Sequence, residues 1–241
     1  MKKLVIIFSV LFAFTSCTQD QIDALLSSTG LTNDEIVEGL KSALNVGTDT
    51  SVTTLNKLDG YYKDDLVKIL LPEEAKAIYS NISKVPGGNV LLEETIKSLN
   101  RAAEDAAIEA KPIFINAITG ITITDGLGIL NGSDTAATAY LRGKTFTALF
   151  NAFQPKIDAS LGKELVGGVS ANSAYSNLVS AYNTASLGGI LFPQITSNSL
   201  SAHVTDKALG GLFLKVADEE KAIRTDPLAR VNDILKKVFA K

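Results

Sequence analysis

Cysteine, methionine and histidine are scarce in this chain of 241 residues, and tryptophan is missing. It has one cysteine, one methionine, one histidine and no tryptophan. One cysteine excludes an internal disulfide framework, and one histidine with one thiol cannot supply the several ligands that a zinc site needs. An aromatic content of 7% gives little support to a ligand site built on aromatic side chains. We therefore expect no metal site and no cofactor.

Basic clusters and long apolar runs are lacking too. The chain has 23 basic and 26 acidic residues, without a basic patch or tail. Neither nucleic acid nor an anionic lipid headgroup is therefore expected as a partner. The longest apolar run, Leu4 to Phe14, is interrupted by Ser9. It is shorter than the ~20 residues that cross a bilayer as a helix.

The first residues instead have the layout of a signal peptide. Lys2 and Lys3 precede the apolar run, and small polar residues follow it up to Cys17. This is the order of a positive region, an apolar region and a cleavage site. The stretch "FTSC" is similar to the lipobox of bacterial lipoproteins, with phenylalanine at the usual leucine position.

We expect residues 1–16 to be a signal peptide, Cys17 to be lipidated, and residues 17–31 to form a tether. The lipid would hold the protein in the cell envelope, most simply at the periplasmic face of the outer membrane. The alternatives are an ordinary secretory signal whose cleavage site contains a cysteine, or a cytosolic protein with a buried N-terminal helix.

Residues 32–241 are expected to form a single all-helical domain, which begins with a capped helix. Thr32 and Glu35 have the spacing of a capping box, and Leu31 and Ile36 that of a hydrophobic staple. This pattern predicts a helix that starts at Thr32 and extends toward Leu58.

The clearest helical pattern lies in the middle of the chain. Apolar residues recur there at alternating steps of four and three: Leu92, Ile96, Leu99, Ala103, Ala106, Ala110, Ile113 and Ala117. The alanines should let another helix approach closely. Pro112 should kink the helix one turn earlier, because proline cannot donate the backbone hydrogen bond.

The remaining patterns predict a bundle-like domain of seven to nine helices. One helix should be capped by Ser133 or Asp134, another should span about residues 200–224, and the last should be capped by Asp226. "VKILLP" and "GITITDG" are read as brief extended segments, with room for one very short β ribbon. The glycines of "DGLGILNG" are read as a helix-breaking turn rather than a phosphate-binding loop.

Several long stretches resemble a known family. "LNRAAEDAAIEAKPIFINAI", "ILNGSDTAATAYLR" and "VTDKALGGLFLKVADEEKAIRTDPLARVNDILKKVF" are similar to the bacterial family of domain of unknown function 4197 (DUF4197), as is the loop "LDGYYKDDLVKILLPEEAKA". The resemblance extends from about Thr32 to the C-terminus. It implies an exported, helical envelope protein, and it supplies no activity, ligand or catalytic residue.

The candidate binding residues are charged side chains on predicted helices: Arg101, Glu104, Glu219 and Arg224. Arg101 lies among alanines and needs a carboxylate partner if it is buried; Glu104, Glu219 or Glu220 could provide it. Glu219 continues the apolar stripe of its helix, unless that stripe ends at Val216. A structural ion pair is the main interpretation of Arg101, and a ligand site is the alternative.

No catalytic residue is assigned. The lone histidine, His203, has Asp206 one turn later, but no second histidine, thiol or nucleophile completes a site, so we read it as a solvated helix residue. We expect a lipid-anchored envelope protein that binds an unknown protein or apolar ligand without catalysis. The first alternative is a carrier of an apolar small molecule or lipid, and the second is a hydrolase.

Overall fold

The computed structural model describes residues 30–164, 168–196, 200–230 and 233–239. Its α-helices are α2 (Asn33–Leu55), α3 (Ala77–Asn81), α4 (Gly88–Ala106), α5 (Ala110–Thr119), α6 (Ile123–Leu130), α7 (Ala136–Leu161), α8 (Ala171–Ala185), α9 (Leu200–Thr225) and α10 (Asp233–Val238). Short 3-10 turns are η1 (Glu73–Ala75), η2 (Ile82–Lys84), η3 (Ala107–Glu109) and η4 (Pro227–Ala229). These described ranges contain no β-strand, so the all-α prediction is confirmed; of the possible β ribbon they show one bridge residue, Val169.

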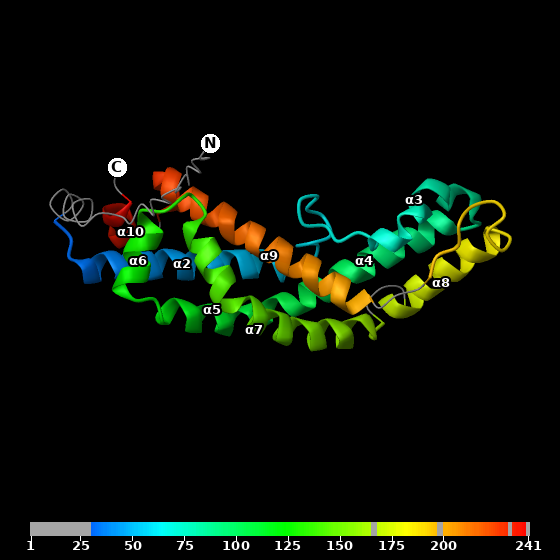
Figure 1. Cartoon of the computed structure of the whole chain (residues 1–241), viewed down its shortest axis with the longest axis horizontal. Coiled ribbons are helices and arrows are strands. Elements are labelled where there is room, and N and C mark those ends of the chain that lie inside the picture. Colours follow the sequence, from blue (N-terminus) through cyan, green and yellow to red (C-terminus); the bar gives the residue numbers. More distant parts are fainter. Residues whose placement is uncertain (1–29, 165–167, 197–199, 231–232, 240–241) are drawn as a thin grey trace, which may run out of the picture.

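The helices form an elongated molecule with two unlike halves (Figure 1). In one half α2 packs against α5, α6, α9 and α10, and in the other half α4 packs against α8. Helices α7 and α9 pack along each other, and both also contact α4. The start of α2 and the end of α8 therefore lie toward opposite ends of the long axis (Figure 1).

The predicted start of the first domain helix is confirmed. The Glu35 N–H donates to Thr32 Oγ1 over 3.2 Å, and the Thr32 N–H donates to Glu35 Oε2 over 2.8 Å. Leu31 and Ile36 are both buried, as a hydrophobic staple requires. The helix ends at Leu55, one turn before the expected limit.

The alanine stripe is buried, and it is broader than the sequence pattern indicated. Ala103, Ala106 and Ala110 are fully buried, and so are Ala102 and Ala107, which lie beside the stripe. The helix tightens into η3 in the turn before Pro112, where the proline cannot donate to the carbonyl of residue 108. The predicted loss of regular α-helix before Pro112 therefore appears as this 3-10 turn, and a kink in the helix axis stays a prediction.

Replacing Ala103 with leucine should lower the free energy of unfolding by about 1–3 kcal/mol, because the added volume has no space at a fully buried helix contact. The matched control is Ala159→Leu, at an exposed position of α7. Urea denaturation measures both variants. Equal midpoints for Ala103→Leu and the wild type would contradict the close helix contact.

Two local predictions are wrong. "GITITDG" does not form an extended segment, because Thr122 and Asp125 make a second capping box that starts α6. Gly126 lies inside this helix, where a Cβ atom would come within 2.7 Å of Val37 Cγ2 on α2. Close helix packing thus explains a glycine that sequence reasoning assigned to a turn.

The C-terminal segment also differs from its prediction. Asp226 caps only the short η4, where the Leu228 N–H donates to Asp226 Oδ1 over 2.9 Å. Helix α10 begins separately at Asp233. Leu228 lies in η4, before the start of α10, and is 90% exposed.

Candidate functional site

One buried carboxylate, Glu220 of α9, holds the beginning of α7. The Ala137 N–H donates to Glu220 Oε1 over 2.9 Å, and the Thr138 N–H donates to Oε2 over 2.7 Å. The Thr138 hydroxyl donates to the same Oε2 over 2.8 Å. The first N–H groups of a helix have no partner within it. Glu220 therefore caps α7 from another helix, in place of the predicted caps Ser133 and Asp134.

Arg224 completes this arrangement one turn further along α9. Its Nε donates to Glu220 Oε1 over 3.0 Å, and Nη2 and Nη1 donate to the carbonyl oxygens of Ile129 and Leu130 over 2.8 and 3.2 Å. These carbonyls belong to the last turn of α6, which attracts cations. The Glu220 cluster, defined here as Glu220, Arg224, Ala137 and Thr138, thus joins the end of α6 to the start of α7.

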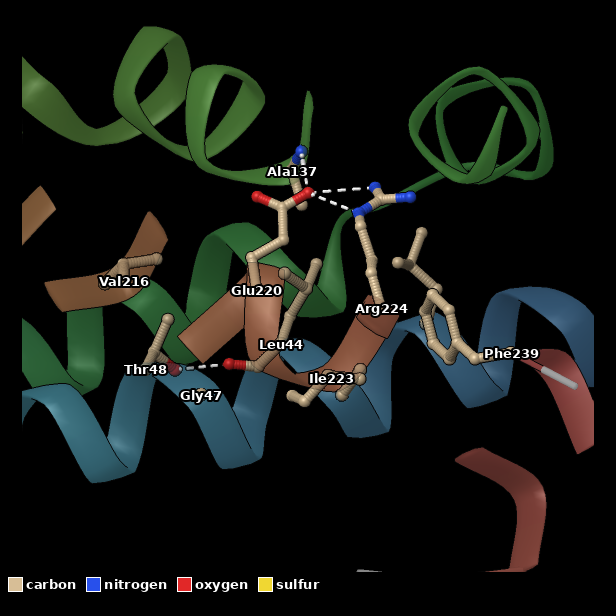
Figure 2. A pocket seen from close by; sticks show the side chains of 11 residues that line it. Leu44, Gly47, Thr48, Ala137, Val216, Glu220, Ile223, Arg224 and Phe239 are labelled. Atoms are coloured by element: carbon tan, nitrogen blue, oxygen red, sulfur yellow. Dashed lines mark hydrogen bonds and ion pairs between the residues drawn. The ribbon is translucent and has the colours of Figure 1, made fainter. Parts of the chain in front are cut away.

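The Glu220 cluster borders a small cavity (Figure 2). Its lining is mainly apolar and comes from α2, α7, α9 and the C-terminal segment: Leu40, Ala43, Leu44, Gly47, Thr48, Ala137, Val216, Glu220, Ile223, Arg224 and Phe239. The volume of the cavity is about 20 Å³, which is enough for one water molecule.

A second ionic group anchors the loop between α2 and η1. Arg101 of α4 pairs with Glu104 and with Asp59, at N–O distances of 2.5 Å each. Glu104 Oε1 also accepts the N–H groups of Tyr61 and Tyr62, each over 3.2 Å. We call Arg101, Glu104 and Asp59 the Arg101 cluster.

Burial and neighbouring charge act differently on the two acids of the Arg101 cluster. Burial raises the pKa of Glu104, and the Arg101 guanidinium offsets this only in part. Hydrogen bonds from Lys63 and then Arg101 lower the pKa of Asp59 to about 2. Asp59 adopts a positive φ of 69°, a backbone conformation in which aspartate is one of the more tolerated residues.

Hydrogen bonds to α4 and α9 hold the rest of this loop. Asn100 accepts the Ile69 N–H and donates to the Ile69 carbonyl oxygen, each over 2.8 Å. The Tyr61 hydroxyl donates to the Ala208 carbonyl oxygen over 2.9 Å. His203 Nε2 lies 2.8 Å from the Leu70 carbonyl oxygen, to which it donates. His203 is thus a partly exposed helix residue that also holds the loop backbone.

The predicted site residues fall into two separate clusters. Arg101 and Glu104 form the expected ion pair, and Arg224 pairs with Glu220. Glu219 belongs to neither: it is half-buried, and burial followed by the nearby Asp218 charge raises its pKa. The acid that α9 buries is its neighbour Glu220. A ligand-binding role for any of these residues stays a prediction.

Two residues that hold the loop between α2 and η1, Asp59 and Asn100, were not among the predicted site residues. Asp59 is 42 residues from Arg101 and sits in a loop without periodicity, so no spacing rule connects the two. Asn100 could have been found, because an amide next to a buried alanine stripe needs hydrogen-bond partners.

The described ranges offer neither a metal-binding cluster nor a single membrane-spanning helix. They contain no group of three or more histidine, cysteine, aspartate or glutamate residues placed to hold a metal ion. No single described helix combines the length and apolarity needed to cross a bilayer. Two helical segments satisfy these criteria only when they are taken together: Gly88–Thr119 and Ile123–Leu130, with a bend of 106° between them.

The comparison with known families supports the resemblance seen in the sequence. The family model described as protein of unknown function (DUF4197) matches residues 30–240. No curated protein and no solved structure matches the chain. The match covers nearly all of the helical part described above, and on this basis the chain belongs to the DUF4197 family.

Proposed function

We propose that this protein is a lipid-anchored bacterial envelope protein that acts by binding a partner, without catalysis. The observation that carries the anchor is the order of Lys2, Lys3, the apolar run and Cys17, the only cysteine. Cys17 lies outside the described residues. An extended chain from Cys17 to Gly30 would reach roughly 45 Å at most, so the helical part would stay close to the membrane that holds the lipid.

The hydrogen bonds of the two buried carboxylates argue against their use in catalysis. Both oxygens of Glu220 accept hydrogen bonds from α7, and Arg224 shares one of them. Both oxygens of Glu104 are also engaged, by the loop backbone and by Arg101. A general acid or base must exchange its proton with a substrate, whereas these groups stabilise helix ends and a loop.

The apolar lining of the cavity beside Glu220 favours one alternative, a carrier of an apolar small molecule. A volume of about 20 Å³ is far below the roughly 300 Å³ of the smallest usual ligand pockets. A carrier would therefore have to open this region, for example by moving Phe239 and α10 away from α2. Native mass spectrometry of the protein purified from its host tests this alternative, which requires a co-purified apolar molecule.

Changing Cys17 to alanine should abolish fatty-acid incorporation and leave an uncleaved precursor or a soluble chain, because no other residue offers a thiol. Labelling of growing cells with a fatty-acid analogue, followed by membrane fractionation, measures both effects. Ser28→Ala is the control, since it changes the tether but not the cysteine. Wild-type protein found processed, unacylated and soluble would contradict the anchor.

A further inference from the structure

The loop that follows α8 exposes three aliphatic side chains at its tip. Leu187, Ile190 and Leu191 are 60%, 82% and 59% exposed. The base of the same loop is buried, since Phe192 packs on Tyr182 with their ring centroids 4.7 Å apart. The tip, defined here as Leu187–Leu191, lies at the end of the molecule opposite the start of α2 (Figure 1).

The backbone of the tip forms a bonded turn that holds these side chains outward. The N–H groups of Gly189 and Leu191 donate to the Ser186 carbonyl oxygen over 3.2 and 3.1 Å. Gly188 and Gly189 adopt positive φ angles, and so does Leu187, at 52°. A leucine in this region is unfavourable and marks a position of possible function.

The sequence around the tip is free of charge over an unusual length. Residues 165–205 contain no aspartate, glutamate, lysine or arginine, in a chain with 20% charged residues. The exposed positions of α8 are asparagine, serine and threonine. One cation, Lys84, does lie beside the base of the loop, with its Nζ 5.3 Å from the Phe192 ring.

The size of the tip indicates the kind of partner. Three aliphatic side chains at this exposure offer about 200–300 Å² of apolar surface. A stable protein interface buries about 800 Å² on each partner, so the tip is too small to hold a second copy of the chain. A bilayer interior accepts a few aliphatic side chains, provided that no charge and few unbonded backbone groups enter with them.

We propose that the tip inserts into the bilayer that holds the lipid anchor, as a second, weak and reversible membrane contact. The choice of this bilayer rests on the proposed anchor: a contact of this size is weak, but tethering to the same membrane gives the tip a high effective concentration there. The elongated helical part would then lie along the membrane.

The test places a fluorophore on the tip of the full-length acylated protein. Ile190→Cys provides a single reactive thiol, because the Cys17 sulfur is occupied by the lipid. The labelled protein is reconstituted into neutral phosphatidylcholine vesicles that contain lipids with a quencher on their acyl chains. We expect the label at residue 190 to be quenched, at low and high salt alike, because no charge takes part.

Leu66→Cys is the matched control, since Leu66 is 74% exposed but lies in a loop with Asp64, Asp65 and Lys68. Its label should not be quenched. Adding Leu187→Ser or Leu191→Ser to the Ile190→Cys protein should lower the ratio of inserted to free tip by about tenfold each. Quenching that is independent of salt and is weakened by the serine substitutions indicates insertion of the tip, and not chance contact with the vesicle surface.

Four results would overturn the proposal. Flotation of the vesicles in a density gradient shows whether the protein is bound to them. Protein that floats with the vesicles while its tip label is unquenched would refute the tip contact and leave the anchor intact. Quenching only by the lipids of a second, added vesicle population would assign the tip to another membrane than the one that holds the anchor. Quenching only by contact between the labels of two copies would assign the tip to a second copy of the chain. Protein that does not float would refute the anchor, and with it the tip contact that depends on it.

Discussion

Replacing Glu220 with alanine is expected to lower the free energy of unfolding by about 3–5 kcal/mol, because it leaves the partner charge buried and unpaired. The Arg224 side chain is 10% exposed and the Glu220 side chain 5%. The same change removes the acceptor of the Ala137 and Thr138 N–H groups, which are buried as well. Chemical denaturation of the wild type and the variant measures the difference.

Two further variants isolate the cause of this loss. Glu219→Ala removes a neighbouring, half-buried acid outside the Glu220 cluster and should change stability by less than about 1 kcal/mol. Combining Glu220→Ala with Arg224→Ala should recover part of the loss, since no lone charge remains. Equal stability of Glu220→Ala and Glu219→Ala would show that the cap on α7 does not stabilise the fold.

Replacing Arg101 with alanine is expected to cost about 2–3 kcal/mol, somewhat less than full burial would give. Arg101 keeps 13% of its side chain exposed, while Glu104, which the change strands, keeps 5%. The loop would also lose the contact between Arg101 and Asp59. Lys63→Ala is the control, because Lys63 is a second cation that pairs with Asp59, and its side chain is 72% exposed. This change should lower the free energy of unfolding by less than about 1 kcal/mol.

A double-mutant cycle on Arg101 and Glu104 distinguishes structural pairing from ligand binding. A structural pair should show a coupling of about 1–3 kcal/mol. A coupling near zero, together with normal stability and loss of a cellular effect or a bound molecule, would instead assign Arg101 to a binding site.

The sequence by itself determined the features that depend on neighbours within one or two helical turns. The capping box of Thr32 and Glu35, the alanine stripe, the disturbance before Pro112 and the extent of α9 all follow from contacts between residues three or four positions apart. The same holds for the pairing of Arg101 with Glu104 and of Glu220 with Arg224, both of which lie on single helices.

Only the tertiary structure decided which charges became buried and what they hold. Glu219 and Glu220 are adjacent in sequence, but one helical step turns the side chain by about 100°. Glu220 points inward because its side of α9 faces the first N–H groups of α7, which have no acceptor within their own helix and donate to Glu220. Asp59 reaches Arg101 for a similar reason, since the loop that carries it folds onto α4. Such partners depend on how helices cross, and a crossing is set by the packing of many side chains together rather than by any one interval along the chain.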